Sequence, residues 1–282
     1  MRRIAVLGAT GMAGHVIAQH LQERGHEVYR MSRSVEKAPR NAAIDARDSE
    51  GVIAWLDSIG PDAVVNAIGV LPAEADRRPD IAVLLNAYLP HRLATYYQGQ
   101  STRIIHLSTD CVYSGTSGGY RETSLPDGMS IYDRSKAMGE LVNTKDLTFR
   151  MSIIGPDISE SGVGLFNWFM KQSGQVNGYS QVMWNGITTI ELARAIDAAL
   201  EQGVAGLYHL VPDCGIDKLS LLKLFREVFE KYDVEIIPYE RVVSDKTLVN
   251  TRSDFHFVIP NYGTMVEDMR IWVYAHRDMY HY

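Results

Sequence analysis

Tyr132 and Lys136 are the two side chains in this sequence whose types and spacing point most directly to chemistry. They lie four residues apart, so on a helix they share one face. A phenol has an ordinary pKa of about 10, and a neighbouring ammonium lowers that pKa by stabilising the phenolate. Such a phenol can pass a proton to a carbonyl oxygen while hydride reaches the carbonyl carbon. The spacing also occurs by chance, so its meaning depends on the rest of the chain.

A pair of hydroxyl residues at a predicted strand end provides the second indication. The predicted strand 103–108 ends in Ser108 and is followed by Thr109. In open α/β sheets, ligands bind at the carboxyl ends of the strands, and a threonine there can hydrogen-bond the carbonyl oxygen that Tyr132 would protonate. Taken alone, Thr109 is a common strand-end cap. However, this strand end is followed later in the chain by the tyrosine–lysine pair, and the combination in this order favours a catalytic role for Thr109.

Three glycines near the beginning of the chain predict a dinucleotide site. Gly8, Gly11 and Gly14 stand between the predicted strand 4–7 and the predicted helix 12–24. The first glycine allows a tight turn, the second lets the backbone approach a pyrophosphate, and the third lets helix and strand pack closely. The helix N-terminus favours the phosphate charge.

The residues after the second predicted strand, 27–31, indicate which nicotinamide cofactor is preferred. Ser32 stands where an NAD-binding protein usually has a carboxylate, and Arg33 follows it. An arginine can pair with a 2′-phosphate, whereas a carboxylate would repel one. We therefore predict a preference for NADP(H). Glu36 lies close enough to leave NAD(H) open, and Arg33 could instead be solvated surface.

Alternating strands and helices in the first half predict an α/β fold with a doubly wound parallel sheet. The expected strands are 4–7, 27–31, 42–44, 63–66, 103–108 and 147–152. The expected helices are 12–24, 49–58, 80–98 and 130–143. Residues 1–152 are thus expected to form a Rossmann-like dinucleotide-binding domain.

The pattern changes after residue 152, where Gly155 and Pro156 interrupt it. We expect residues 153–282 to form mainly a smaller substrate-binding lobe, with some elements packing back on the first domain. Its expected elements are helices 165–172, 190–201 and 218–231, strands 207–210 and 234–237, and a closing amphipathic helix in 264–282.

Composition excludes several classes of protein. The net charge of −6 disfavours nucleic acid as a main partner. The two cysteines, Cys111 and Cys214, form neither a disulfide framework nor a zinc motif, and no metal site is expected. No apolar run approaches the length of a membrane span, so a cytoplasmic location is expected. The sequence leaves a homodimer open.

The glycine loop, the Ser-Thr-Asp-x-Val-Tyr-x-Gly segment beginning at Ser108 and the Tyr-x-x-Ser-Lys-x-x-Gly-Glu segment beginning at Tyr132 together resemble the extended short-chain dehydrogenases/reductases. The most similar subgroup is the dTDP-4-dehydrorhamnose reductase-like proteins. The resemblance implies a catalytic trio of Thr109, Tyr132 and Lys136, with Lys136 also touching the nicotinamide ribose. It implies the following cofactor-binding residues: Gly8, Thr10, Gly11, Met12, Gly14, Ser32, Arg33, Asp45, Asn66, Ala67, Ile68, Tyr132 and Lys136.

The same resemblance implies substrate contacts and also shows departures. The implied substrate-side residues are Thr109, Asp110, Cys111, Asn167 and Trp184. Thr188 stands where the family usually has proline, and Trp184 is unusual for its position. These departures leave the sugar open without affecting the hydride chemistry.

The activity expected from the resemblance is NADPH-dependent reduction of a keto group on a nucleotide-activated sugar, with the proton supplied by Tyr132. The related dehydratases carry Thr-Asp-Glu at this strand end, and Cys111 in place of that glutamate disfavours dehydration. An epimerase of the same fold remains an alternative, because the same trio serves it. A second alternative is a non-catalytic NADP-binding subunit similar to the regulatory subunit of methionine adenosyltransferase.

Overall fold

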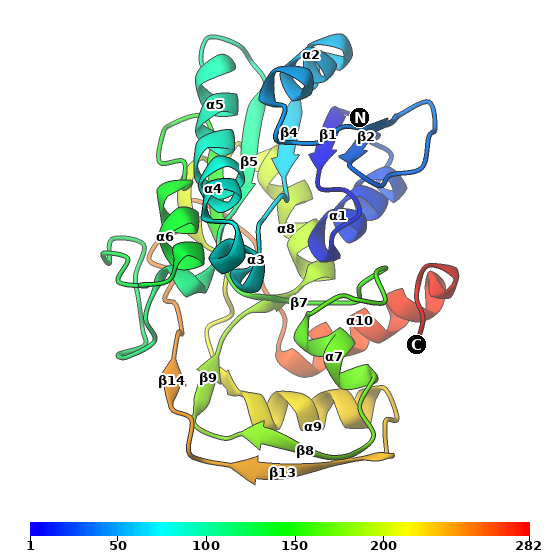
Figure 1. The fold of residues 1–282 in the computed structure, drawn as a ribbon, viewed down its shortest axis with the longest axis vertical. Helices are drawn as coiled ribbons and strands as arrows, with labels where there is room; N and C mark the ends of the chain where they lie inside the picture. Colours follow the sequence, from blue (N-terminus) through cyan, green and yellow to red (C-terminus); the bar gives the residue numbers. More distant parts are fainter.

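A seven-stranded parallel sheet forms the centre of the protein in a computed structural model that describes all residues 1–282 (Figure 1). Its strand order is β11-β6-β5-β4-β1-β2-β3. The strands are β1 (Arg3–Leu7), β2 (Glu27–Ser32), β3 (Asn41–Ala43), β4 (Ala63–Asn66), β5 (Arg103–Leu107), β6 (Leu147–Arg150) and β11 (Gly206–His209). The predicted doubly wound α/β fold is confirmed.

Both faces of the sheet are covered because its strands are apolar on both sides. In β1, Ile4 and Val6 pack into a large core with α1 (Met12–Glu23) and α8 (Thr189–Gln202). Ala5 and Leu7 point the other way, into a second core with α2 (Ser49–Ile59) and α5 (Leu89–Tyr96). This alternation is the side-chain period of two expected for a strand.

The second half of the chain builds a smaller lobe below the carboxyl ends of the sheet in Figure 1. Its main unit is the parallel pair β8 (Gly174–Tyr179) and β13 (Val234–Tyr239), packed against α9 (Lys218–Val228). The other elements are β7 (Ile153–Ile154), α7 (Leu165–Met170), β9 (Val182–Trp184), β10 (Ile187–Thr188), β12 (Ile216–Asp217), β14 (Ser244–Asp245) and α10 (Tyr262–Ala275). Two elements of this half, α8 and β11, belong to the large sheet and its covering layer.

The predicted helix 80–98 is interrupted in the structure. After the short helices α3 (Pro72–Arg77) and α4 (Pro79–Ala82), residues Val83–Tyr88 form a π-helical segment that leads into α5. Pro90 lacks an amide hydrogen and so cannot donate the usual helical bond to the Asn86 carbonyl. Wider π-turns of this kind often occur at functional sites.

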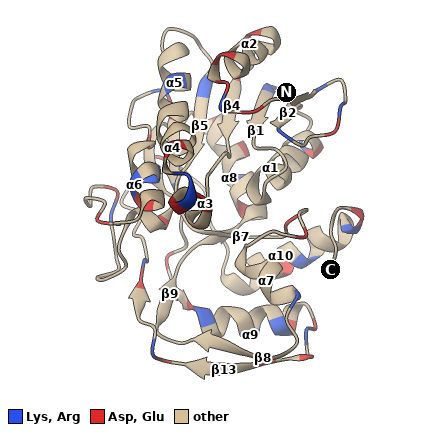
Figure 2. Ribbon diagram, in the orientation of Figure 1, with Lys and Arg blue, Asp and Glu red and all other residues tan.

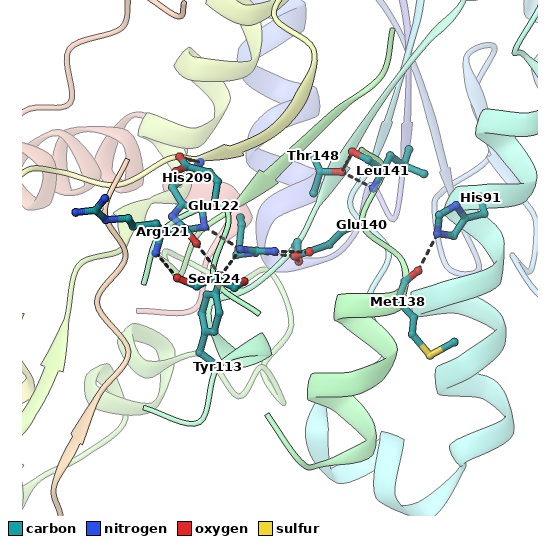
Figure 3. Close-up of polar contacts among 12 residues, drawn as sticks. His91, Tyr113, Arg121, Glu122, Ser124, Met138, Glu140, Leu141, Thr148 and His209 are labelled. Atoms are coloured by element: carbon teal, nitrogen blue, oxygen red, sulfur yellow. Dashed lines mark hydrogen bonds and ion pairs between the residues drawn. The ribbon is translucent and has the colours of Figure 1, made fainter. Parts of the chain in front are cut away.

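The predicted helix 130–143 is also shorter than expected. Helix α6 covers Ile131–Met138 and ends at Gly139. A Cβ atom on Gly139 would lie 1.9 Å from the Asn86 carbonyl oxygen, so the chain passes against the π-helical segment at a distance that only glycine allows. The end of α6 is fixed by His91, whose Nε2 donates to the Met138 carbonyl at 2.7 Å (Figure 3).

A buried polar network ties the chain after α6 to three strands. Arg150 of β6 donates to both carboxylate oxygens of Glu140, at 2.7 and 2.5 Å. Its other nitrogen contacts the Tyr113 hydroxyl at 2.5 Å and His209 Nε2 at 2.9 Å. Glu140 also accepts from Ser108 Oγ at 2.6 Å. Figure 3 shows Tyr113, Glu140 and His209 converging from separate segments.

Charges on the exterior are mixed in sign. Figure 2 shows Lys and Arg interspersed with Asp and Glu along the ribbon, which agrees with the net charge of −6. None of the helices has both the length and the apolar character needed to cross a bilayer.

We expect Glu140→Gln to lower the free energy of unfolding by about 3–5 kcal/mol, because it leaves the Arg150 guanidinium buried without its counter-charge. Urea unfolding followed by circular dichroism measures the change. The control is Glu50→Gln, because Glu50 pairs with Arg92 and its side chain is 73% exposed, so its loss should cost less than about 1 kcal/mol. Equal effects of the two substitutions on the free energy of unfolding would contradict the stabilising role of the Glu140–Arg150 pair.

The stability of the protein should fall as the pH decreases below about 6.5. Burial is the largest influence on the pKa values of His15, His20, His106 and His209, and it lowers all four. The unfolded chain therefore binds more protons than the folded chain in this range, which favours unfolding. Urea unfolding at about pH 7.5 and about pH 5 measures the slope. His209→Gln should reduce the slope, because it removes one of these four imidazoles. A stability that is unchanged or higher at the lower pH would disprove the prediction.

Candidate active site

The carboxyl ends of β1, β4 and β5 bring the candidate residues to one edge of the sheet. The register pairs Leu7 with Asn66, and Asn66 with His106. The glycine loop therefore begins beside the end of β4, and Thr109 follows two residues after the end of β5. Helix α6, which carries Tyr132 and Lys136, packs against the segment that follows Thr109.

The glycine loop has the close contacts that its three glycines predicted. Gly8 has a φ of 78°, and a Cβ there would lie 3.1 Å from the Ala67 carbonyl oxygen and 3.2 Å from Ile68 Cγ1. A Cβ on Gly14 would lie 2.1 Å from the Gly8 carbonyl oxygen. Gly11 caps α1 without a side-chain hydrogen bond, so the first-turn amides are free of a capping side chain. This arrangement fits an anionic pyrophosphate.

Hydroxyl groups and arginines surround the end of β2. Thr10 Oγ1 lies 3.0 Å from Ser32 Oγ, which also accepts from the Ser34 amide at 3.2 Å. Arg33 is exposed beside them. The hydrogen bond from Arg47, with a smaller contribution from the Arg33 charge, lowers the pKa of Asp45. Two cations thus accompany Asp45 at this end of the site.

Asn66 is buried and connects the end of β4 to β5. Its Oδ1 accepts from the Ile68 amide at 3.3 Å, and its Nδ2 lies 3.2 Å from His106 Nδ1. His106 is fully buried, and its Nε2 lies 3.5 Å from Lys136 Nζ. Burial, together with the charge of Lys136, lowers the pKa of His106 well below its ordinary value, so the imidazole is neutral beside the ammonium.

Tyr132 interacts with the Thr109 side chain. Burial raises the pKa of the Tyr132 phenol and the nearby Cys111 adds to this effect, while a side-chain hydrogen bond with Thr109 acts in the opposite direction. The Thr109 hydroxyl also lies 3.2 Å from Asp110 Oδ1 and accepts from the Cys111 amide at 3.1 Å. The Thr109 hydroxyl is therefore fixed and buried at the end of β5, and Tyr132 beside it is half-buried.

The tyrosine–lysine spacing predicted a lowered pKa for Tyr132, and the structure contradicts that prediction. The Lys136 ammonium donates to the Leu107 carbonyl at 2.6 Å and is not among the groups that shift the pKa of Tyr132. The pKa of Tyr132 is raised rather than lowered, because loss of hydration outweighs the other influences. Burial lowers the pKa of Lys136 to about 8, and the charge of Glu140 opposes that shift.

Asn86 is a site residue that the sequence patterns did not identify. It lies in the π-helical segment and is completely buried. Its amide pairs with both backbone groups of Val70, at 2.7 and 3.1 Å, and donates to Ser135 Oγ at 3.1 Å. Ser135 precedes Lys136, so Asn86 orients the catalytic face of α6. An isolated asparagine within a mostly apolar helical pattern was the only signal for it.

The substrate-side candidates do not all meet at one point. Asp110 and Cys111 are adjacent to Thr109 and are buried or nearly so. Asn167 is buried in α7 and donates to the Gly162 carbonyl at 2.6 Å, so it holds a loop of the small lobe. Trp184 is buried beside Tyr262, with ring centroids 5.8 Å apart. Met12 of the glycine loop reaches the small lobe, because a Cβ on Gly164 would lie 2.7 Å from its sulfur.

A cavity of about 530 Å³ opens in the small lobe. Helix α7, strand β8 and helix α9 provide its walls, and Trp168 and Tyr179 contribute aromatic surface. Lys218, the first residue of α9, also lines it. An aromatic-lined cavity with a few polar groups is typical of a small-molecule site.

Comparisons with known proteins agree with this geometry. The probable low-salt glycan biosynthesis reductase Agl14 of Haloferax volcanii is 28% identical over 232 residues, which cover 75% of each chain. Methionine adenosyltransferase 2 subunit beta of Xenopus tropicalis is 27% identical over 228 residues, covering 74% of this chain and 66% of that protein. The dTDP-4-dehydrorhamnose reductase of Bacillus anthracis, solved in complex with NADP, superposes with a TM-score of 0.81 at 18% identity, covering 96% of this chain and 99% of that one.

The family described as the RmlD substrate binding domain matches residues 1–246. The predicted resemblance to extended short-chain dehydrogenases/reductases of the dTDP-4-dehydrorhamnose reductase-like subgroup is therefore confirmed. This chain belongs to the RmlD substrate binding domain family.

Proposed function

We propose that this protein is an NADPH-dependent oxidoreductase that reduces a keto group on a nucleotide-activated sugar. The observation that carries the proposal is that the half-buried Tyr132 of α6 interacts with the Thr109 side chain at the sheet edge that also holds the glycine loop. Reductases acting in glycan biosynthesis and on dTDP-4-dehydrorhamnose are among the relatives, which supports this class of substrate.

In this proposal Tyr132 is the proton donor. Reduction of a carbonyl requires a donor that is protonated at neutral pH, and the raised pKa of Tyr132 keeps its phenol neutral. Thr109 orients the carbonyl oxygen with its hydroxyl. The Lys136 ammonium donates to the Leu107 carbonyl and so fixes α6 against the end of β5. The nicotinamide, when bound, supplies the hydride.

The cofactor-binding part of the proposal uses the residues grouped around the glycine loop. Gly8, Gly11 and Gly14 leave room for a pyrophosphate beside the free amides of α1. In this proposal, the hydroxyls of Thr10 and Ser32, which lie 3.0 Å apart, and the exposed guanidinium of Arg33 recognise the ribose 2′-phosphate. The small lobe, mainly residues 153–282, provides the substrate site in this proposal.

Replacing Tyr132 by phenylalanine should reduce kcat by about 10²- to 10⁴-fold, because the variant lacks the proton donor. NADPH affinity should stay within about twofold of wild type, since the change removes one hydroxyl and no charge. Turnover is measured as loss of NADPH absorbance with a panel of 4-keto nucleotide sugars, and binding by fluorescence titration. Tyr88→Phe, at an exposed tyrosine, serves as the control. Near-normal turnover of the Tyr132 variant would refute the assignment.

Arg33→Ala should reduce the kcat/KM ratio of NADPH to NADH by about tenfold or more, because it removes a cation that pairs with the 2′-phosphate. Steady-state kinetics with both cofactors provides the measurement. Lys37→Ala is the matched control, as Lys37 is an exposed cation on the same loop. A wild-type preference for NADH would contradict the proposed NADP(H) specificity.

The similarity to methionine adenosyltransferase 2 subunit beta supports a second candidate, a non-catalytic NADP-binding subunit. The same substrate panel separates the two. Wild-type protein that binds NADPH but oxidises it with none of the keto sugars would favour the subunit; product that is epimerised without net NADPH consumption would favour an epimerase.

A further inference from the structure

Lys218 is a cation without a protein partner next to the candidate active site. It is the first residue of α9 and is half-buried. Its ammonium lies 4.5 Å from the centroid of the Trp184 ring, and it forms no ion pair or hydrogen bond with any other side chain. Lysine is rarely withdrawn from water without a charged partner, so a side chain in this state is available to a ligand.

Its position on the helix is electrostatically unfavourable for the protein alone. Asp217 caps α9, accepting from the Ser220 amide at 2.9 Å, and Lys218 follows directly at the positive end of the helix. Cations are normally stabilising at the opposite end. Burial also lowers the pKa of Lys218 to about 8, although the charges of Asp110 and Cys111 oppose that shift. The helix dipole and the loss of hydration both disfavour a charged lysine at this position in the protein alone. A bound anion would offset both effects.

Asp110 interacts with Lys218 by charge but forms no ion pair with it. Burial raises the pKa of Asp110, while Lys218 and Lys246 act in the opposite direction. Asp110 is held instead by the Thr109 hydroxyl at 3.2 Å. Two lysines, Lys218 and Lys246, therefore bring positive charge close to Asp110.

Lys218 stands between two regions that a nucleotide sugar would occupy together. It lines the aromatic cavity of about 530 Å³ that contains Trp168 and Tyr179. In addition, its charge interacts with Asp110 and Cys111, which are adjacent to Thr109. A nucleotide sugar consists of a nucleoside and a sugar joined by a diphosphate, so with the sugar at Thr109 the diphosphate falls at the junction.

We propose that Lys218 is a specificity-determining residue that binds the diphosphate of the nucleotide-activated substrate. The inference rests on the proposed function, because it assumes that the sugar end lies at Tyr132 and Thr109. Trp184 has a supporting role: its ring packs against the ammonium and keeps it pointing between the cavity and the strand end.

The test compares binding of nucleoside diphosphates, nucleosides and NADPH to the full-length protein by isothermal titration calorimetry. The probes are dTDP, UDP, GDP and ADP, each with its nucleoside. Lys218→Met should weaken binding of the preferred diphosphate by about 10- to 100-fold, because one charged contact is lost. Binding of the matching nucleoside and of NADPH should stay within about twofold. Lys218→Arg should restore most of the diphosphate affinity.

Two controls separate this role from a structural one. Lys223→Met removes an exposed cation from the same helix and should leave all affinities unchanged. Lys218→Gln, which keeps a polar side chain, should show the same selective loss if Lys218→Met folds poorly, and thermal unfolding checks the fold of each variant. A proportional loss of nucleoside and diphosphate binding would overturn the proposal.

The outcomes also distinguish this proposal from the proposed function. If Lys218→Met binds the diphosphate like wild type while keto sugars are still reduced, the assignment of Lys218 is wrong and the reductase stands. If wild type binds none of the diphosphates, the proposal for Lys218 and the nucleotide-sugar specificity both fail.

Discussion

The hydrogen bond from the Lys136 ammonium to the Leu107 carbonyl, at 2.6 Å, is the contact on which the candidate site depends. It joins α6 to the end of β5, and so sets Tyr132 opposite Thr109. Burial makes the bond strong and also makes it costly to lose, since an ammonium without a partner in this environment would be poorly solvated. Asn86 holds α6 through Ser135, and Ser108 and Arg150 hold Glu140 just after the end of α6.

The electrostatics of this arrangement favour a proton donor over a proton acceptor. Tyr132 loses hydration on burial, which keeps its phenol neutral, and the neighbouring His106 is also neutral. Three lysines carry positive charge near the end of β5: Lys136 donates to the Leu107 carbonyl, and Lys218 and Lys246 interact by charge with Asp110. We propose different roles for two of them: Lys136 positions the catalytic helix, and Lys218 binds the substrate.

Much of the fold could be predicted from the sequence because short apolar runs and glycines report local geometry. The six strands expected in residues 1–152 correspond to β1–β6, and Gly8 and Gly14 make the tight turn and the close helix–strand packing that their spacing predicted. Helix lengths were less predictable. The early end of α6 depends on the Asn86 carbonyl, more than fifty residues away in the chain, and no local pattern around Gly139 reports that contact.

The site itself was predictable in residue type but not in its electrostatics. The tyrosine–lysine spacing predicted a lowered phenol pKa, whereas the structure raises that pKa, because the depth of burial and the carbonyl partner of Lys136 come from tertiary packing. Asn167 and Trp184 were expected on the substrate side, and the structure buries both within the small lobe. The sequence predicted only that Lys218 lies in a helix. Its approach to Asp110 depends on packing between the two lobes, which no local pattern reports.

The protonation state of Tyr132 tests the account most directly. Tyrosine labelled with ¹³C at Cζ, with the Tyr132 signal assigned from the Tyr132→Phe variant, gives the pKa of this phenol by NMR titration of the cofactor-free protein. The account predicts that the Tyr132 signal remains that of a neutral phenol beyond about pH 10, the ordinary pKa of tyrosine. Ionisation of Tyr132 below that pH would contradict it, and would show that the Lys136 ammonium outweighs burial.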